Sequence, residues 1–412
     1  MTSGASGGFV RAVIFDYKSL FFPGPENTIV DVRTLLESLS DVGIDICVFS
    51  TNVMNLEEEC VTRSFPVLQN LVTQKDVQDQ KKRGSPNWID AATAKTGLQR
   101  HELLYIGVTN LDWRTAINAG VFYLHAGWRS KIPPGTTSIV AHSPSDVMKF
   151  LDHFLVRPPR WSFRLDDPAN GFYLRALLPA SATLPSTSPR SSFSLQDVFT
   201  YDRDIRVGDT SARNLLMLHV LSSCYVEGLL GRNTIFCTYP SSKIGQYSSQ
   251  IEEYVRPAAS LVHGYYRNDL LIRETEAPDT SLVRVRARSE GRIPDVSIAT
   301  QASTVRLGDK YRGKLGGKRV IVFDDFTTSG MSLEWARNLL LAAGASNVVT
   351  LTIGKYKTTH DRHILTSANI DPYAVNMLSP SDYSIQGQVM IQDRAVQDIM
   401  HGLFQKWIRE VA

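Results

Sequence analysis

The sequence contains no apolar run near the ~20 residues that a membrane-spanning helix needs, so we predict no membrane partner. Its first eight residues, Met-Thr-Ser-Gly-Ala-Ser-Gly-Gly, lack the basic segment that begins a secretion signal. Charge of one sign is also scarce, because 44 lysines and arginines face 41 aspartates and glutamates, a net charge of +3. This balance disfavours nucleic acid as a partner without excluding it. We expect a cytoplasmic protein.

Cysteine is rare as well, and its spacing is uninformative for metal binding. The four cysteines, Cys47, Cys60, Cys224 and Cys237, form no pair with the spacing of a zinc site or a disulfide framework. We interpret them as small buried hydrophobic residues in a reducing compartment. A length of 412 residues with 43% apolar residues predicts two or three domains with packed cores.

The most informative stretch, residues 319–332, reads Arg-Val-Ile-Val-Phe-Asp-Asp-Phe-Thr-Thr-Ser-Gly-Met-Ser. Its continuous apolar run, Val320–Phe323, is typical of a parallel strand that is covered on both faces. Two carboxylates, Asp324 and Asp325, follow at the end of the strand where α/β proteins bind ligands. A small polar loop and then a helix are predicted after them, because apolar residues beyond Ser332 recur at helical spacing.

This order of elements suits a sugar phosphate. Backbone N–H groups of the small loop can close around a phosphate at the N-terminus of the following helix. The two carboxylates beside it can accept hydrogen bonds from ring hydroxyls. A strand that merely ends in an acidic turn, with Ser332 as an ordinary helix N-cap, is the alternative.

The stretch resembles the 5-phosphoribosyl 1-diphosphate (PRPP) signature of type I phosphoribosyltransferases. The resemblance implies a five-stranded parallel core with a hood, Mg²⁺ as cofactor, and transfer of ribose phosphate from PRPP to a nitrogen nucleophile. It implies that Asp324 and Asp325 hold the ribose hydroxyls and the metal ion. The residues that would wrap the 5′-phosphate are Thr327, Thr328, Ser329, Gly330, Met331 and Ser332.

One departure from the signature bears on the acceptor. Relatives that act on 6-oxopurines usually carry an aspartate where this chain has Thr328, which argues against a hypoxanthine-guanine type of enzyme. Orotate-like, uracil-like, amidotransferase-like and unknown acceptors stay open.

Two further segments fit the same resemblance. The loop after a predicted strand at 231–237 falls where the family places its pyrophosphate loop, so Ser241, Ser242 and Lys243 are candidate ligands of the diphosphate. A surface turn with a solvated lysine is the alternative. The long basic segment 275–319 lies where the family has a flexible lid, although its alternating arginines also suit an edge strand.

Residues 9–156 alternate predicted strands and helices, as in a parallel α/β domain. The order resembles the haloacid dehalogenase (HAD) superfamily. The resemblance implies that Asp16, at the end of the first strand, is the nucleophile, and that Ser50, at the end of the second, binds a phosphoryl group. Lys82, before Gly-Ser-Pro, would be the charge-neutralising lysine, and Asp16 and Asp112 would be metal ligands.

Two departures argue against catalysis by this domain. Lys18 replaces the general acid and base two residues after the nucleophile, a contribution of ~10²–10⁴-fold to such reactions. Val108 stands where the superfamily usually has a further Mg²⁺-binding aspartate. Lys18 could occupy the place of the cation and bind a phosphate without cleaving it. An active phosphatase with the other domain as its specificity module stays open.

The sequence therefore predicts an α/β protein of two doubly wound parallel-sheet domains, HAD-like at residues 1–157 and phosphoribosyltransferase-like at 158–412. The segment 180–194, rich in Ser, Thr, Pro and Ala, is predicted to be an exposed loop or a disordered insert. The predicted function is Mg²⁺-dependent phosphoribosyl transfer from PRPP to a nitrogenous acceptor. The alternative is a non-catalytic PRPP or nucleotide sensor in a larger complex, and a homodimer stays open.

Overall fold

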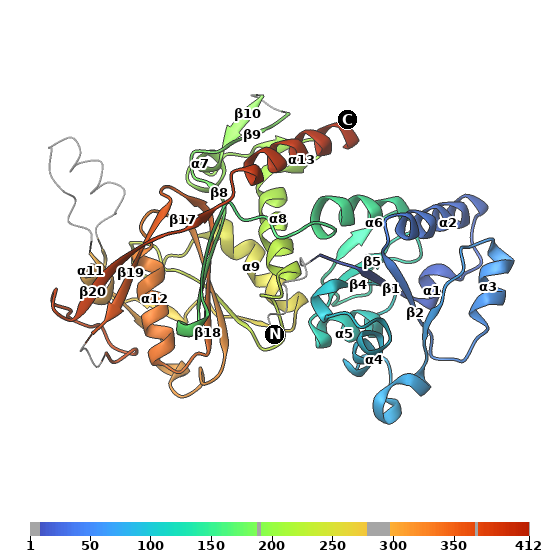
Figure 1. Ribbon diagram of the computed structural model, residues 1–412, viewed down its shortest axis with the longest axis horizontal. Helices are drawn as coiled ribbons and strands as arrows, with labels where there is room; N and C mark the ends of the chain where they lie inside the picture. Colours follow the sequence, from blue (N-terminus) through green and yellow to red (C-terminus); the bar gives the residue numbers. More distant parts are fainter. Residues whose placement is uncertain (1–8, 188–190, 278–296, 367–369, 412) are drawn as a thin grey trace. The chain divides into compact units, whose positions relative to one another are not determined.

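The computed structural model describes residues 9–187, 191–277, 297–366 and 370–411. The chain divides into two compact units (Figure 1). The first unit comprises residues 1–159, 221–232 and 257–264, and the second comprises 160–220, 233–256 and 265–412. Among the described residues, none of the helices combines the length and the apolar character that a membrane span requires.

The first unit alternates strands with helices along most of its length (Figure 1). Its strands are β1 (Ala12–Asp16), β2 (Asp45–Phe49), β3 (Asn70–Val72), β4 (Leu103–Gly107), β5 (Phe122–Ala126) and β6 (Ile139–Ala141). Its helices are α1 (Tyr17–Leu20), α2 (Glu26–Asp41), α3 (Leu56–Arg63), α4 (Asn87–Thr96), α5 (Asn110–Ala119) and α6 (Pro144–Phe150), with the short turns η1 (Gln74–Asp76), η2 (Gln78–Gln80), η3 (Arg100–Glu102) and η4 (Leu151–Leu155).

All six strands of this unit form one parallel sheet in the order β3-β2-β1-β4-β5-β6. The central strands are completely buried, which explains their continuous apolar sequences. The strand order reverses between β1 and β4, and in open α/β sheets ligands bind beyond the carboxyl ends of the strands at such a point. Asp16 ends β1 at this place.

The first unit also contains two later segments of the chain, which a boundary at residue 157 does not include. They hold the C-terminal ends of α8 (Ala212–Val226) and α9 (Ser249–Leu261). The fully buried Tyr225 fixes the first of them. Its hydroxyl lies 2.5 Å from the Leu103 carbonyl and accepts a hydrogen bond from the Phe122 N–H at 3.1 Å.

The second unit begins with an antiparallel pair and continues with alternating strands and helices. Its strands are β7 (Phe163–Asp167), β8 (Phe172–Pro179), β9 (Thr183–Pro185), β10 (Ser192–Ser194), β11 (Arg206–Val207), β12 (Thr210–Ser211), β13 (Ile235–Thr238), β14 (Tyr265–Tyr266), β15 (Leu271–Arg273), β16 (Val305–Leu307), β17 (Arg319–Thr327), β18 (Asn347–Lys355), β19 (Thr359–Leu365), β20 (Tyr383–Val389) and β21 (Ile391–Gln392). Besides α8 and α9, its helices are α7 (Leu195–Phe199), α11 (Ile298–Ala302), α12 (Met331–Ala342) and α13 (Ala395–Val411), with the turns η5 (Pro168–Asn170) and η6 (Asp309–Tyr311).

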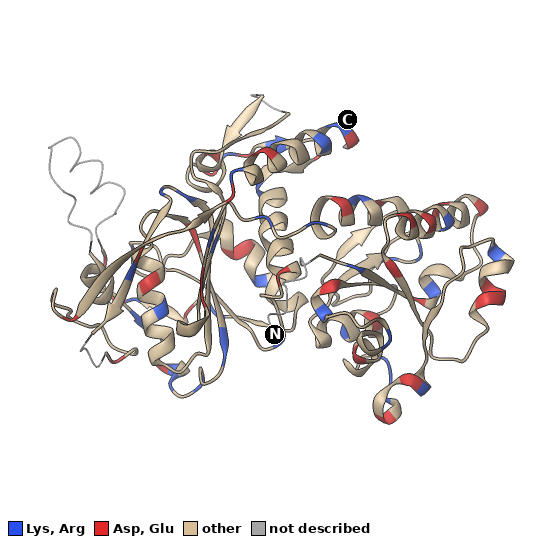
Figure 2. Cartoon of the chain, viewed as in Figure 1, with Lys and Arg blue, Asp and Glu red and all other residues tan. Residues whose placement is uncertain are grey.

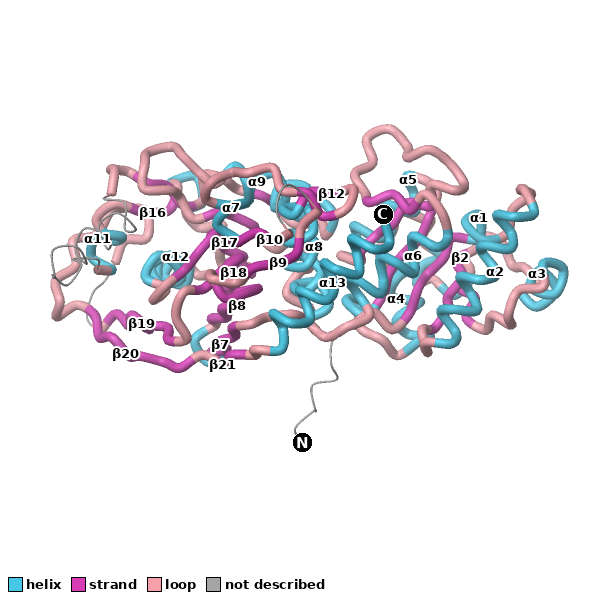
Figure 3. Tube along the Cα trace, turned by 90° about the horizontal axis from the view of Figure 1, so that it is seen from above, coloured by secondary structure: helices cyan, strands magenta, loops and turns pink. Residues whose placement is uncertain are grey.

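The main sheet of the second unit has the order β14-β13-β17-β18-β8-β7-β21. Its first five strands are mutually parallel, whereas β7 is antiparallel to β8 and the edge strand β21 is in turn antiparallel to β7. β17 is an inner strand of this sheet, and its residues 320–323 are buried. A separate antiparallel hairpin, β19–β20, lies beside helix α12 (Figures 1 and 3).

The prediction for segment 180–194 is wrong in its described part. Residues 183–185 and 192–194 pair as the antiparallel strands β9 and β10. Leu184 and Phe193 are buried, and the Phe193 ring lies 6.1 Å from that of Phe404 in α13. Residues 278–296 of the predicted basic lid lie outside the described residues.

Candidate functional site

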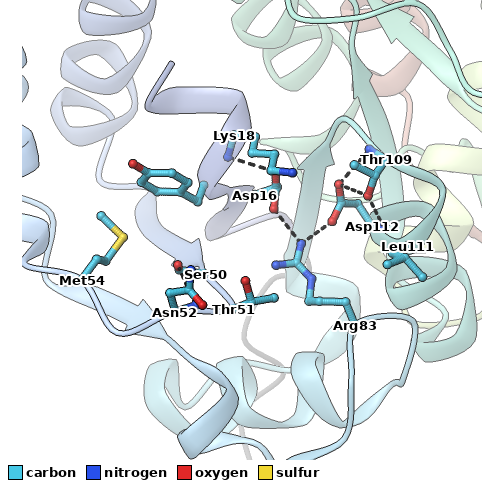
Figure 4. Close-up of a pocket in the computed structure, with 11 residues that line it drawn as sticks. Asp16, Lys18, Ser50, Thr51, Asn52, Met54, Arg83, Thr109, Leu111 and Asp112 are labelled. Atoms are coloured by element: carbon cyan, nitrogen blue, oxygen red, sulfur yellow. Dashed lines mark hydrogen bonds and ion pairs between the residues drawn. The ribbon is translucent and has the colours of Figure 1, made fainter. Parts of the chain in front are cut away.

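A cavity of about 380 Å³ lies at the carboxyl ends of β1, β2 and β4 in the first unit (Figure 4). The predicted residues Asp16, Ser50 and Asp112 all line it, as does Lys18. The other lining residues are Tyr17, Thr51, Asn52, Met54, Arg83, Thr109 and Leu111. Lys82 is exposed and lies outside this lining.

Arg83 is the cation at the centre of the cavity wall. Its Nη2 atom lies 3.0 Å from Asp16 Oδ1 and also contacts Asp112 Oδ1, so one guanidinium bridges the two carboxylates (Figure 4). The side chain is buried and packs against the rings of Phe49 and Trp88, whose centroids lie 5.4 and 4.9 Å from its Cζ atom. Such contacts between a guanidinium and aromatic faces favour the charged form inside the protein.

The second carboxylate of this bridge, Asp112, caps helix α5. Its Oδ2 atom accepts hydrogen bonds from the Val108 N–H at 3.1 Å and from the Thr109 N–H and hydroxyl at 2.8 Å each. Its Oδ1 atom accepts from the Tyr105 hydroxyl at 3.0 Å and from Arg83. A carboxylate offers about four lone-pair positions, so these five donors saturate Asp112.

The residues of this cavity do not fit a Mg²⁺ ion. A guanidinium stands between the two carboxylates that the sequence assigned to the metal, and Asp112 has no oxygen left to coordinate it. Three predictions are therefore corrected: Asp112 is a helix cap and not a metal ligand, and neither Lys82 nor Lys18 takes the central cationic place. Arg83, next to Lys82 in the run of three basic residues 81–83, was the available sequence signal.

The environment of Asp16 disfavours its charged form. Burial, and then the negative charge of Asp112, raise the pKa of Asp16 to about 6, although Arg83 opposes the shift. The Lys18 N–H donates to Asp16 Oδ2 at 3.0 Å, which places both carboxylate oxygens in hydrogen bonds.

The second candidate site is the acid pair of β17. Asp324 and Asp325 are partly exposed at the carboxyl end of the strand. Asp324 Oδ1 accepts from the Asp325 N–H at 3.1 Å, and Asp325 Oδ1 accepts from the Phe326 N–H at 2.7 Å. Within the described residues neither carboxylate forms an ion pair. Unlike the first cavity, this pair offers carboxylate oxygens that suit Mg²⁺ and has no cation bonded to it, although the charge of Arg273 acts on Asp324.

The loop after the acid pair is short, because β17 continues to Thr327 and α12 begins at Met331. The buried Lys355 bonds through Nζ to the Thr328 carbonyl, and the Asp361 N–H donates to the Ser329 carbonyl at 3.0 Å. In a trans peptide the following N–H points away from the carbonyl. The N–H groups of Ser329 and Gly330 therefore point away from these two donors, as an anion-binding loop requires.

A buried polar cluster that includes His360 and Glu334 packs against this loop at Gly330. Gly330 has φ +89°, and a Cβ atom there would overlap the ring of His360. His360 Nε2 bonds to Glu334 Oε1 at 2.7 Å, and Glu334 is fully buried in the first turn of α12. Glycine at this N-cap is required both by its backbone angle and by the histidine beneath it.

The predicted pyrophosphate loop lies beside the acid pair, because β13 is the neighbour of β17 and the Tyr239 N–H donates to the Phe323 carbonyl at 2.8 Å. Ser241 and Lys243 form a local turn, in which the Lys243 N–H donates to Ser241 Oγ at 3.3 Å. The buried Arg273 fixes this turn by bonding to the carbonyls of residues 240 and 241. Lys243 itself is exposed.

The acid pair has a cost in stability that depends on pH. Burial and the neighbouring carboxylate raise the pKa of Asp324, and burial raises the pKa of Asp325, from the ordinary value of 3.8. Raised carboxyl pKa values mean that the folded state holds protons more tightly, so its stability falls as pH rises above about 4. We expect Asp324→Asn/Asp325→Asn to be more stable than the wild type at pH 8 by roughly 0.5–2 kcal/mol.

Urea unfolding at pH 8 and pH 4.5 tests this expectation, since the advantage of the double variant is expected to shrink at the lower pH. A double variant that is less stable than the wild type at pH 8 would assign the pair a structural role instead.

No protein-family model and no curated protein matches the chain. The solved structures that resemble it include a HAD-superfamily hydrolase from Geobacter sulfurreducens (12% identity, 34% of this chain and 100% of that chain, TM-score 0.26). CbbY from Rhodobacter sphaeroides in complex with phosphate is another (13%, 35% and 99%, 0.28). A third is the cobalt-bound deoxy-D-mannose-octulosonate 8-phosphate phosphatase from Haemophilus influenzae (12%, 35% and 87%, 0.27). Identities and TM-scores this low do not establish a family for the chain.

Proposed function

We propose that the second unit is a Mg²⁺-dependent phosphoribosyltransferase that uses PRPP and a nitrogenous acceptor and releases pyrophosphate. One observation carries the proposal: a carboxylate pair without an ion pair in the described residues lies near the carboxyl end of an inner parallel strand, and a loop follows whose N–H groups point away from its anchored carbonyls. The carboxylates suit ribose hydroxyls and Mg²⁺, and the loop at the start of α12 suits the 5′-phosphate.

The proposed catalysis depends on position and charge more than on proton transfer. Departure of pyrophosphate leaves positive charge at C1′ of the ribose, and carboxylates nearby stabilise it. Mg²⁺ would be held by Asp324 and Asp325 and would neutralise the diphosphate. The turn around Lys243 adjoins the same end of the sheet and would offer a point charge to that diphosphate.

Titration of PRPP with Mg²⁺ into the full-length protein tests the proposal. We expect saturable binding by the wild type and at least tenfold weaker binding by Asp324→Asn/Asp325→Asn. Glu57→Gln/Glu58→Gln is the matched control, because it removes two adjacent carboxylates from the exposed face of α3 and is expected to leave binding unchanged. No PRPP binding by the wild type would contradict the proposal.

A non-catalytic PRPP or nucleotide sensor is the second candidate. The observation that favours it is Arg83, which occupies the place of a metal in the first unit and suits a domain that has no metal-dependent hydrolysis. PRPP binding without pyrophosphate release, over a panel of pyrimidine, orotate-like and amine acceptors, would decide for the sensor. Release of pyrophosphate with one acceptor would decide for the transferase.

A further inference from the structure

A cavity of the second unit lies at the amino-terminal end of its main sheet, opposite to the end that carries the acid pair of β17. Its volume is about 400 Å³, within the range of small-molecule sites. Four of the residues that line it are cationic: Arg267, Lys310, Lys314 and Lys318. We call it the basic pocket.

The floor of the basic pocket is apolar and aromatic, and the strand register explains why. Ile235 of β13 is the register partner of Tyr265 in β14 on one side and of Val320 in β17 on the other, so the three side chains share one face of the sheet. Lys318 directly precedes β17 and lines the same pocket. The Tyr265 side chain is 40% exposed, so its ring is accessible from the pocket.

The wall of the pocket is a fixed turn. Tyr311 of η6 is buried, its hydroxyl donates to Asp269 Oδ1 at 2.5 Å, and its carbonyl accepts from the Tyr373 hydroxyl at 3.1 Å. Leu315 is fully buried between Lys314 and Lys318 and anchors the turn that carries both lysines. These lysines are therefore held at the rim by the core beneath them.

The charge of the pocket is largely uncompensated. Asp269 pairs with Lys310, but in the described part of the chain Arg267, Lys314 and Lys318 have no ion pair. The Arg267 guanidinium lies 5.3 Å from the centroid of the Tyr265 ring, so a planar cation already stacks on the exposed aromatic face. Basic residues are otherwise spread over many elements of the chain (Figure 2), so three cations around one cavity that have no ion pair within the described residues require an explanation.

We propose that the basic pocket binds a nucleoside phosphate, with its base against Tyr265 and Arg267 and its phosphates between Lys314 and Lys318. An aromatic floor and a cationic rim match the two halves of such a ligand. A purely inorganic anion would leave the floor unused, and an apolar ligand would leave three charges unpaired.

The site is separate from the acid pair of β17. Lys318 precedes Asp324 by six residues along an extended segment, a separation of about 20 Å at ~3.3 Å per residue. A ligand in the basic pocket therefore cannot fill the proposed PRPP site, and the two sites can be tested with separate variants.

The test is calorimetric titration of ATP, adenosine and inorganic phosphate, each in EDTA, into the full-length protein. We expect saturable ATP binding that weakens with added salt, and binding of adenosine or phosphate at least tenfold weaker. Lys314→Glu/Lys318→Glu is expected to weaken ATP binding at least tenfold, and Tyr265→Ala at least threefold. The control Lys75→Glu/Lys131→Glu makes the same charge change at two exposed lysines of the first unit and is expected to change nothing.

Three outcomes would overturn the proposal. Absence of saturable ATP binding would show that the basic pocket does not bind a nucleoside phosphate. If a single-stranded oligonucleotide then binds although ATP does not, the ligand of the pocket is a nucleic acid. If phosphate binds as tightly as ATP and Tyr265→Ala has no effect, the pocket binds an anion and does not recognise the nucleoside. Loss of ATP binding in Asp324→Asn/Asp325→Asn, with no effect of Lys314→Glu/Lys318→Glu, would place the nucleotide at the acid pair.

Discussion

Replacing Arg83 by alanine is expected to destabilise the first unit by about 3–5 kcal/mol, the usual cost of removing one partner from a buried ion pair. The variant leaves Asp16 and Asp112, both buried, facing each other across the space of the lost guanidinium. Loss of Arg83 frees one lone-pair position on Asp112 Oδ1, to which only the Tyr105 hydroxyl then donates, so one oxygen of each carboxylate faces the open space. Such a pair of oxygens suits a hard divalent cation. We therefore expect Mg²⁺ to raise the melting temperature of Arg83→Ala and to leave that of the parent protein unchanged.

The measurement is thermal unfolding with and without millimolar Mg²⁺, in an Asp324→Asn/Asp325→Asn background that removes metal binding by the second unit. Arg83→Met is the matched control, because it removes the same charge but fills the space, and we expect it to be destabilised without rescue by Mg²⁺. Lys82→Ala, at the exposed neighbouring residue, is expected to change stability by less than about 0.5 kcal/mol.

An Arg83→Ala protein as stable as its parent would show that the bridge does not stabilise the first unit. A parent protein that Mg²⁺ stabilises would show that the arginine does not exclude the metal. Either result would contradict the assignment of Arg83 as the bridge between Asp16 and Asp112. The wild-type protein is expected to show no Mg²⁺-dependent hydrolysis of a generic phosphomonoester, because Arg83 occupies the space between the carboxylates and Lys18, not an aspartate, stands two residues after Asp16.

Much of the fold follows from the sequence alone, because buried parallel strands require continuous apolar runs. The predicted strand at Val320–Phe323 lies within β17, and the one at 231–237 overlaps β13. The polar residue that ends each run, such as Asp16 or Asp324, marks the carboxyl end of its strand. Periodicity and strand ends are local signals, and the sequence therefore carries them directly.

The wrong predictions concern features that depend on contacts between residues far apart in the sequence. Lys82 and Arg83 are neighbours of the same charge, and which of them points inward depends on Asp16, Phe49 and Trp88. Segment 180–194 has the composition of a loop, but the helix α13 near the end of the chain packs against β9 and places Phe404 beside the buried Phe193. Composition cannot reveal a partner some 200 residues away.

The support of the loop at 328–330 was likewise invisible in the sequence. Its carbonyls are held by Lys355 and by the backbone of Asp361, about 30 residues further along the chain. Burial lowers the pKa of Lys355 to about 8. Only the tertiary structure shows that Ser329 and Gly330 are oriented by these contacts.

Glu334 is the residue of the second unit whose removal is expected to cost the most stability. It is fully buried, and its carboxylate accepts hydrogen bonds from His360 Nε2 at 2.7 Å and Arg337 Nε at 3.1 Å and pairs with Arg362 Nε at 3.1 Å. Burial by itself raises the pKa of Glu334, but the bond from His360 and the charges of Arg337 and Arg362 outweigh it, so the pKa is lowered. The carboxylate is therefore the charged centre of a buried cationic cluster.

Glu334→Gln keeps the size of this side chain and removes its charge, which leaves the buried Arg337 without its ion pair and the buried Arg362 with Asp167 alone. We expect a loss of about 3–5 kcal/mol at neutral pH, measured as the shift of the urea midpoint. The control is Glu252→Gln, which breaks an exposed pair with Arg256 and is expected to cost less than about 1 kcal/mol. Because the pKa of Glu334 is lowered in the folded protein, its contribution is present above the ordinary value of 4.5 and is lost as pH falls below it.

The position of Glu334 links this stability to the proposed site. Glu334 holds the ring of His360 against Gly330, the N-cap of α12. The substitution of Glu334 is therefore expected to loosen the loop at 328–330 as well as to destabilise the second unit. PRPP binding by Glu334→Gln, measured where the variant is still fully folded, is therefore expected to be weaker than in the wild type, whereas Glu252→Gln is expected to bind normally. A Glu334→Gln protein whose stability lies within 1 kcal/mol of the wild type would contradict the stabilising role of the cluster. A destabilised variant that binds PRPP as tightly as the wild type would show that the cluster does not support the loop.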